Sequence, residues 1–200
     1  KHSCNEKIKQ WYWSVVFSEA YSSAVDSQLT LDFKELKEWF SDDTKIPKSV
    51  EEARILIKTL NLKKVNTFSS AVFRGVLSLL AIKGSKDLQT GEMVNDRNDY
   101  HKDHIFPKSK SEKYVSTKKE LDSILNMAWL TSATNESKGA KEPKKYFEDF
   151  ESKYNGNKGA YVDVLESHFI NKEDYDYLLD NNFEEFITER ESAFLDEIKR

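Results

Sequence analysis

The sequence predicts an α+β protein that is mainly helical, with a short ββα unit embedded between helical segments. Three observations support this fold class. Apolar residues recur at helical spacing over the first 85 residues and again from residue 146 onward. Two short β-prone runs, residues 100–106 and 124–130, lie between these segments. A Lys- and Ser-rich stretch separates the two runs, and a cappable helical turn follows the second.

The N-terminal segment is expected to form a helical scaffold. Four amphipathic stretches are predicted as helices: residues 7–24, 33–40, 53–60 and 68–83. Asp32 is the predicted N-cap of the second helix, and Ser49 with Glu52 forms a capping-box pattern before the third. Gly84 is expected to end the fourth helix, because glycine readily adopts the left-handed conformation of a helix C-terminus.

The second half of the chain begins with the ββα unit. Pro107 is expected to end the first strand, since proline lacks the backbone N–H that a strand ladder needs. Thr131 or Ser132 is expected to cap a short helix that ends at Gly139. The prediction is one domain over residues 1–200, comprising a helical scaffold (1–85), the ββα unit (100–143) and C-terminal helices (146–200).

Composition excludes several classes of protein. The 200 residues are 38% hydrophobic and 33% charged, and no apolar run is long enough to span a membrane. The single cysteine, Cys4, excludes an intramolecular disulfide framework and a cysteine-based zinc site, so a reducing cytoplasm is expected. A first residue that is Lys rather than Met is expected for a fragment of a longer chain.

The stretch "YHKDHIFPKS", Tyr100–Ser109, carries the chemistry of the ββα unit. Cleavage of a phosphodiester needs a base to deprotonate water and a positive charge to neutralise the leaving oxygen. The imidazole of His104 can accept a proton near neutral pH. A hard divalent cation prefers oxygen ligands from Asp and Asn, and this part of the chain holds Asp103, Asn126 and Asn135. Asn126 lies in the second run among apolar residues and is therefore expected to be hydrogen-bonded.

The charge of the chain is unevenly distributed. The formal net charge is −4, but residues 101–145 have a balance of +4 and residues 146–200 a balance of −9. The motif thus lies in the basic segment, where Lys108 and Lys138 are predicted to bind flanking phosphates of a nucleic acid. Such charge runs are equally typical of solvated faces.

The order of these motifs resembles an HNH (His-Me finger) nuclease. "DHIFPKS", "ILNMAWLT" and "TNESKGAKEP" match the family's acidic-His pair before an apolar-apolar-Pro, its central Asn and its helical Asn. The resemblance implies a DNA endonuclease with His104 as general base and Asp103 and Asn135 as ligands of one Mg²⁺ or Mn²⁺ ion. It also implies that Asn126 stabilises the loop between the strands and that Lys138 reaches a phosphate. One such site cuts one strand at a time.

The resemblance extends over most of the chain. The stretches "WYWSVVFSEAYSSAVDSQLTLDFKELKEWF", "FRGVLSLLAIKGSKDLQTGE" and "FEEFITERESAFLDEI" are similar to the C-terminal region of GmrSD-type restriction endonucleases, bacterial phage-defence proteins that cut foreign or modified DNA. Those proteins also carry a ParB-like nucleotide-binding half with a DGQQR-type signature, which this sequence lacks. The resemblance implies a bacterial, cytoplasmic nuclease half whose NTP-binding sensor lies elsewhere in the chain or in a partner subunit.

Several alternatives remain open at this level. Many relatives in that family have His-His where this chain has Asp103-His104, and strict strand alternation would place these two side chains on opposite faces. His101 is then an extra or substitute ligand, and His101 with His104 also resembles half of a zinc site. The rival functions are a non-catalytic module that binds DNA or a partner through residues 108–119, and an RNase-like toxin.

Overall fold

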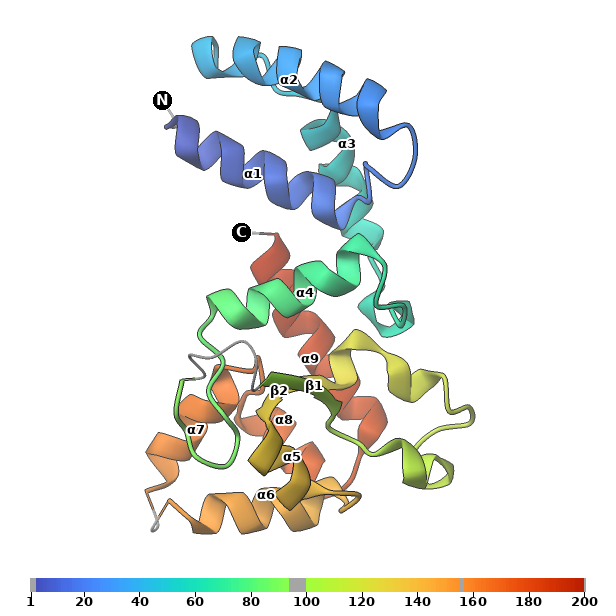
Figure 1. Cartoon of the computed structure of the whole chain (residues 1–200), viewed down its shortest axis with the longest axis vertical. Helices are drawn as coiled ribbons and strands as arrows, with labels where there is room; N and C mark the ends of the chain where they lie inside the picture. Colours follow the sequence, from blue (N-terminus) through green and yellow to red (C-terminus); the bar gives the residue numbers. More distant parts are fainter. Residues whose placement is uncertain (1–2, 94–99, 155–156, 200) are drawn as a thin grey trace. The chain divides into compact units, whose positions relative to one another are not determined.

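A computed structural model describes residues 3–93, 100–154 and 157–199 of the chain (Figure 1). The chain divides into two compact units. Unit 1 comprises residues 1–61, 68–75 and 198–200, and unit 2 comprises residues 62–67 and 76–197. The assignment of residues 1–200 to one domain in three segments stays a prediction. Among the described helices, none combines the length and apolar character needed to cross a membrane.

Unit 1 is helical, as predicted. Its helices are α1 (Cys4–Phe17), α2 (Val25–Ser41), α3 (Lys48–Leu56) and the first part of α4 (Ala71–Ile82). At Gly75 in α4, an added Cβ would lie 2.7 Å from a Val16 side-chain carbon. Glycine at this position therefore allows close packing of α4 against the end of α1.

Two predicted helix starts in unit 1 are wrong. Helix α2 begins at Val25, so Asp32 lies within it and is fully buried rather than at its N-cap. Its carboxylate accepts hydrogen bonds from Trp11 Nε1 and Gln28 Nε2, both at 3.0 Å, and from Tyr21. Helix α3 begins before the predicted capping box, so Ser49 is inside the helix and caps nothing. In both cases a polar side chain typical of a cap is placed in the helix by tertiary packing.

Helix α4 ends as predicted. The backbone N–H of Gly84 donates to the carbonyl of Ala81, and that of Ser85 donates to Leu80, while Gly84 has a φ of +76°. These are the two hydrogen bonds of a Schellman motif, which satisfies carbonyls left unpaired at a helix end. A turn from Asp87 to Glu92 follows, closed by the N–H of Asp87 donating to the carbonyl of Glu92 at 2.9 Å.

The centre of unit 2 is a two-stranded antiparallel sheet followed by a short helix. Strand β1 (Tyr100–His104) pairs with β2 (Met127–Thr131), with His104 opposite Met127. Helix α5 (Ser132–Lys138) follows; Thr131 caps it and Gly139, at a φ of +51°, ends it, as predicted. The strand, strand, helix order of the prediction is confirmed, and the protein is mainly helical with one small sheet in the part that the structure describes.

Both strands are shorter than predicted. β1 ends at His104, and residues 124–126 form a 3₁₀ turn before β2 begins. The N–H of Ile105 still donates to the carbonyl of Asn126 at 2.8 Å, but the N–H of Phe106 donates to the Asn126 side chain instead. This substitution of a side chain for a backbone acceptor ends the ladder before Pro107 is reached.

The remaining helices of unit 2 cover the C-terminal third of the chain. They are α6 (Pro143–Ser152), α7 (Lys158–Glu166), α8 (Lys172–Leu179) and α9 (Phe183–Ile198). The predicted loop at residues 154–159 falls partly outside the described residues, and α7 begins within it. The buried face of α9 carries Phe186, Ile187 and Phe194, which follow the helical spacing predicted from the sequence.

Candidate functional site

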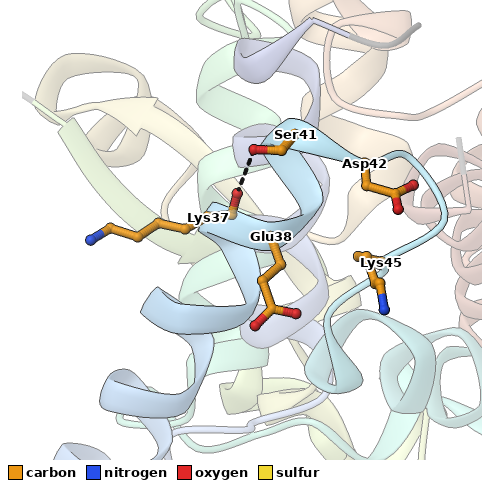
Figure 2. Close-up of a pocket in the computed structure, with 5 residues that line it drawn as sticks. All are labelled: Lys37, Glu38, Ser41, Asp42 and Lys45. Carbon is orange, nitrogen blue, oxygen red and sulfur yellow. Dashed lines mark hydrogen bonds between the residues drawn. The ribbon is translucent and has the colours of Figure 1, made fainter.

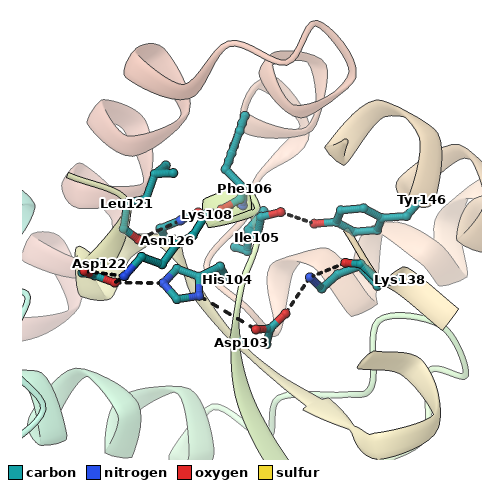
Figure 3. Close-up of polar contacts among 11 residues, drawn as sticks. Asp103, His104, Ile105, Phe106, Lys108, Leu121, Asp122, Asn126, Lys138 and Tyr146 are labelled. Carbon is teal, nitrogen blue, oxygen red and sulfur yellow. Dashed lines mark hydrogen bonds and ion pairs between the residues drawn. The ribbon is translucent and has the colours of Figure 1, made fainter. Parts of the chain in front are cut away.

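His104 lies at the end of β1 between two carboxylates (Figure 3). Its Nε2 is 3.2 Å from Oδ1 of Asp122, and its Nδ1 is 3.8 Å from Oδ1 of Asp103. The imidazole is partly exposed, with 22% of the side-chain surface accessible. The structure therefore brings Asp103 and His104 together, although strict strand alternation would separate them, because the strand ends at His104.

Asp103 is ionised under all physiological conditions. Burial alone would raise the pKa of its carboxyl, but the contacts with His104 and with the ammonium of Lys138 outweigh this effect and lower the pKa to about 2. Oδ2 of Asp103 lies 2.6 Å from Nζ of Lys138. The site thus contains a permanent anion close to the imidazole, and that anion already has a cationic partner.

Asp122 is a site residue that no sequence motif predicts. It lies at the end of a 3₁₀ turn, Glu120–Asp122, and contacts both His104 and Lys108, whose Nζ is 2.8 Å from Oδ1. Burial raises its pKa and the Lys108 and His104 contacts lower it more strongly. Only the fold reveals this role, since 18 residues separate Asp122 from His104 and no motif connects them.

Asn126 holds the turn that follows β1. Its side chain is fully buried, and its Oδ1 accepts from the N–H of Phe106 at 2.8 Å. Its Nδ2 donates to the carbonyls of Phe106 at 3.1 Å and Leu121 at 2.9 Å. Asn126 therefore ties the residues after His104 to the turn that carries Asp122, and it satisfies its own polar atoms as expected for a buried amide.

Lys138 is buried beside Asp103 and does not project into solvent. Only 3% of its side-chain surface is accessible, and its Nζ lies 5.7 Å from the ring centroid of Tyr146. The Tyr146 hydroxyl donates to the carbonyl of Ile105 at 3.0 Å (Figure 3). Lys138 and Tyr146 thus form the wall of the site on the α5 and α6 side.

Asn135 lies on the face of α5 that is turned toward β1. At the start of α5, Ser132 Oγ is 2.7 Å from Nε2 of His101, and at its end Lys138 contacts Asp103. Residues three apart share a helix face, so Asn135 lies between these two contacts. Its side chain is partly buried and makes no hydrogen bond to any described residue. His101 is exposed and is engaged with Ser132.

Asp87 fixes the position of α5. Its carboxylate is fully buried and accepts from Thr131 N, Thr131 Oγ1 and Thr134 Oγ1 at 2.7–3.0 Å, and from two backbone N–H groups of its own turn. Burial raises its pKa, but these hydrogen bonds lower it below the ordinary value. The buried acid therefore joins the turn after α4 to the start of α5, and so sets where Asn135 and Lys138 lie.

Arg190 of α9 holds the backbone on either side of Asn126 by hydrogen bonds. It is fully buried and donates to the carbonyls of Leu125 and Met127, on either side of Asn126, and twice to that of His168. Burial lowers its pKa to about 9. The sequence did offer a signal, since Arg190 occupies a position on the apolar stripe of its helix where a charge is unexpected unless it is bonded.

The basic segment is partly neutralised by its own acids. Nζ of Lys110 and Nζ of Lys113 both lie within 3.3 Å of Oε1 of Glu142, and Lys108 pairs with Asp122. Lys118 and Lys119 are exposed and form no ion pair with any residue in the described ranges. Within the predicted DNA-binding loop, residues 108–119, the lysines without an acidic partner therefore lie at its far end.

The donors for a metal ion are few. Among residues 3–93, 100–154 and 157–199 no three His, Cys, Asp or Glu side chains group closely enough to hold a metal. This gives no support to a zinc site at His101 and His104. The site offers two carboxylates, Asp103 and Asp122, each already paired with a lysine. The amide of Asn135 on α5 makes no hydrogen bond to either of them within the described ranges.

Another depression, in unit 1, has a different character (Figure 2). It is lined by Lys37, Glu38, Ser41, Asp42 and Lys45 at the end of α2. Ser41 Oγ donates to the carbonyl of Lys37, and Asp42 accepts from Thr44, so these polar groups serve the helix end. No side chain of the candidate site lies here, and we assign it no role.

The chain is similar to a longer archaeal protein. It is 32% identical to the uncharacterized protein MJ0686 of Methanocaldococcus jannaschii over 217 aligned positions, which cover 96% of this chain. The chain spans 37% of the length of that protein. Neither a known protein family nor a solved structure matches the chain.

Proposed function

We propose that the protein is a metal-dependent DNA endonuclease of the HNH type that nicks DNA by hydrolysing phosphodiesters. The observation that carries the proposal is the position of His104. A partly exposed imidazole lies between an ionised Asp103 and Asp122 at the end of the first strand of a ββα unit, followed by a turn that Asn126 holds. This is the arrangement expected of a general base beside a cation site.

The contacts of His104 fit either tautomer, and the one that would make Nδ1 the base carries its proton on Nε2. Asp122 accepts a hydrogen bond only if Nε2 carries the proton, and this tautomer leaves Nδ1 as the acceptor. Nδ1 faces Asp103 at 3.8 Å, so it would take the proton of a water molecule on the Asp103 side of the ring. The imidazolium formed in this step would lie between two carboxylates, which stabilise it.

The donor set fits Mg²⁺ or Mn²⁺. Mg²⁺ is commonly bound by one or two protein oxygens, with water and substrate phosphate completing its coordination. Asp103 would be such an oxygen donor, and Asn135 on α5 would be the second. When bound, the cation would neutralise charge on the phosphate and on the leaving 3′ oxygen.

The surrounding lysines favour a polyanionic substrate. Lys108 is 43% exposed at its side chain and lies on the Asp122 side of His104, while Lys118 and Lys119 extend the positive surface along the loop. Each would position a backbone phosphate without reading sequence.

We further propose that the nuclease belongs to a restriction or phage-defence system. The resemblance to the C-terminal region of GmrSD-type enzymes supports this context, and foreign or modified DNA is the expected substrate. A ParB-like NTP-binding sensor half, in the same chain or in a partner subunit, would then control access to DNA. The greater length of the archaeal relative is compatible with such a further half.

A plasmid-nicking assay tests the catalytic assignment. His104→Ala should abolish nicking in Mg²⁺ or Mn²⁺, whereas His101→Ala, on the same strand but exposed, should retain most of it. EDTA should stop cleavage and added Mn²⁺ should restore it. Undiminished nicking by a His104→Ala protein with a native circular dichroism spectrum would reject His104 as the base.

The second candidate is a non-catalytic module that binds DNA or a partner. It is favoured by the charge pairing of the site, since Lys138 neutralises Asp103 and Lys108 neutralises Asp122 without any metal. A binder would shift DNA in a gel and leave supercoiled plasmid intact at every metal concentration. Parallel reactions with RNA distinguish a DNA nuclease from a ribonuclease.

A further inference from the structure

The ammonium of Lys138 occupies a position that the proposed function also requires for a metal ion. Nζ lies 2.6 Å from Oδ2 of Asp103, and the side chain is almost completely buried. Its other contacts are weak: the carbonyl of Gly139 at 3.4 Å and the face of the Tyr146 ring at 5.7 Å. Asp103 is the one carboxylate paired with this ammonium among the described residues.

The Lys138 ammonium and a divalent metal ion cannot bind Asp103 independently of each other. A buried ammonium that loses its anion is strongly destabilised, because burial removes the water that would otherwise solvate it. A divalent ion placed on the same carboxylate would also repel Lys138 across a few ångströms of poorly solvated protein. Displaced from Asp103, Lys138 would need another anion within reach of the site.

We propose that Lys138 and the divalent cation compete for Asp103, and that a DNA phosphate releases Lys138 by taking it as a new partner. This inference rests on the proposed function. It predicts that metal binds weakly to the free protein and more tightly in the presence of DNA. Lys138 thus restricts loading of the metal to the moment when substrate is bound.

The local charge balance supports this coupling between metal binding and DNA binding. The Asp103–Lys138 pair is neutral, so a divalent ion alone would leave a local charge of +2 in a partly buried site. A phosphate diester that joins the site lowers this excess by one. Thermodynamic linkage then requires that DNA and metal strengthen each other's binding.

Binding of Mn²⁺, followed by electron paramagnetic resonance without any turnover, tests the proposal. Lys138→Met removes the charge and keeps most of the volume, and it should bind Mn²⁺ roughly tenfold or more tightly than the wild type. Lys138→Arg keeps the positive charge and should bind Mn²⁺ as weakly as the wild type does. Lys141→Met, which removes a surface lysine paired with Asp149, should change nothing. Adding Asp103→Asn to Lys138→Met should abolish the gain.

A measurement on the wild type covers the case in which Lys138→Met does not fold. A buried, ion-paired ammonium exchanges its protons slowly and is observable by ¹H–¹⁵N NMR. Mg²⁺ with a short DNA duplex should remove or shift the Lys138 signal at a lower Mg²⁺ concentration than Mg²⁺ alone.

The outcomes separate this inference from the proposed function. Equal Mn²⁺ affinity in wild type and Lys138→Met, or a gain that survives Asp103→Asn, overturns the competition and leaves the nuclease proposal standing. An unchanged Lys138 signal at saturating Mg²⁺ overturns it likewise. If no variant binds Mn²⁺ even with DNA present, the metal site and the competition both fall.

Discussion

Replacement of Asn126 by alanine should destabilise unit 2 strongly, because one buried side chain makes three hydrogen bonds to backbone. The change removes the acceptor for the N–H of Phe106 and the donor for the carbonyls of Phe106 and Leu121. All three backbone groups belong to the loop between β1 and β2, which has no strand pairing of its own there.

The size of the effect follows from these contacts. Each hydrogen bond contributes about 1 kcal/mol net, and a buried N–H left without a partner costs about 1–3 kcal/mol more. The expected loss of unfolding free energy is therefore about 4–6 kcal/mol, at or above the upper end for single substitutions. For a protein of this size such a loss lowers the melting temperature by about 10–20 °C.

Urea denaturation followed by circular dichroism measures this loss. Asn135→Ala is the matched control, since it truncates an asparagine in the same unit that makes no hydrogen bond to a described side chain or backbone group. It should change the unfolding free energy by less than about 0.5 kcal/mol. If Asn126→Ala is no more destabilising than Asn135→Ala, then the buried amide does not hold the loop that carries Asp122 to His104.

Three further outcomes are expected. Arg190→Lys should cost about 3 kcal/mol or more in urea unfolding, because one ammonium cannot reach the three carbonyls that the guanidinium satisfies. Asp87→Asn should lower the free energy of unfolding at pH 7. Because the pKa of the Asp87 carboxyl is lowered in the folded protein, the wild type should lose stability as the pH falls below about 4, and the variant should lack this loss. His168 has its pKa lowered to about 4 by burial, with Nε2 bonded to the Lys86 carbonyl and Nδ1 unpartnered. The wild type should therefore lose stability relative to His168→Gln as the pH falls from about 6.5 to 4, and parallel curves would contradict this.

Local sequence patterns are sufficient to predict the helical periodicity, the order strand, strand, helix, and the ends of α4 and α5. These features depend on neighbours in the chain: Gly84 and Gly139 adopt positive φ, and Thr131 caps the helix that directly follows it. The same local rules failed for Asp32, whose partners Trp11 and Tyr21 are distant in sequence. A polar residue before an apolar run is typical of a cap, but burial with donors from another helix stabilises it equally well.

The charge pairs of the site, by contrast, depend on long-range packing. Asp122 and Lys138 reach His104 and Asp103 from segments 18 and 35 residues away, and no periodicity or motif fixes such long-range pairs. The sequence marked Lys138 as a phosphate ligand because it is a lysine in a basic segment, whereas the fold buries it against a carboxylate. The physical reason is that a buried charge must find a partner of opposite sign, and the nearest partner is set by how α5 lies along β1 rather than by distance along the chain.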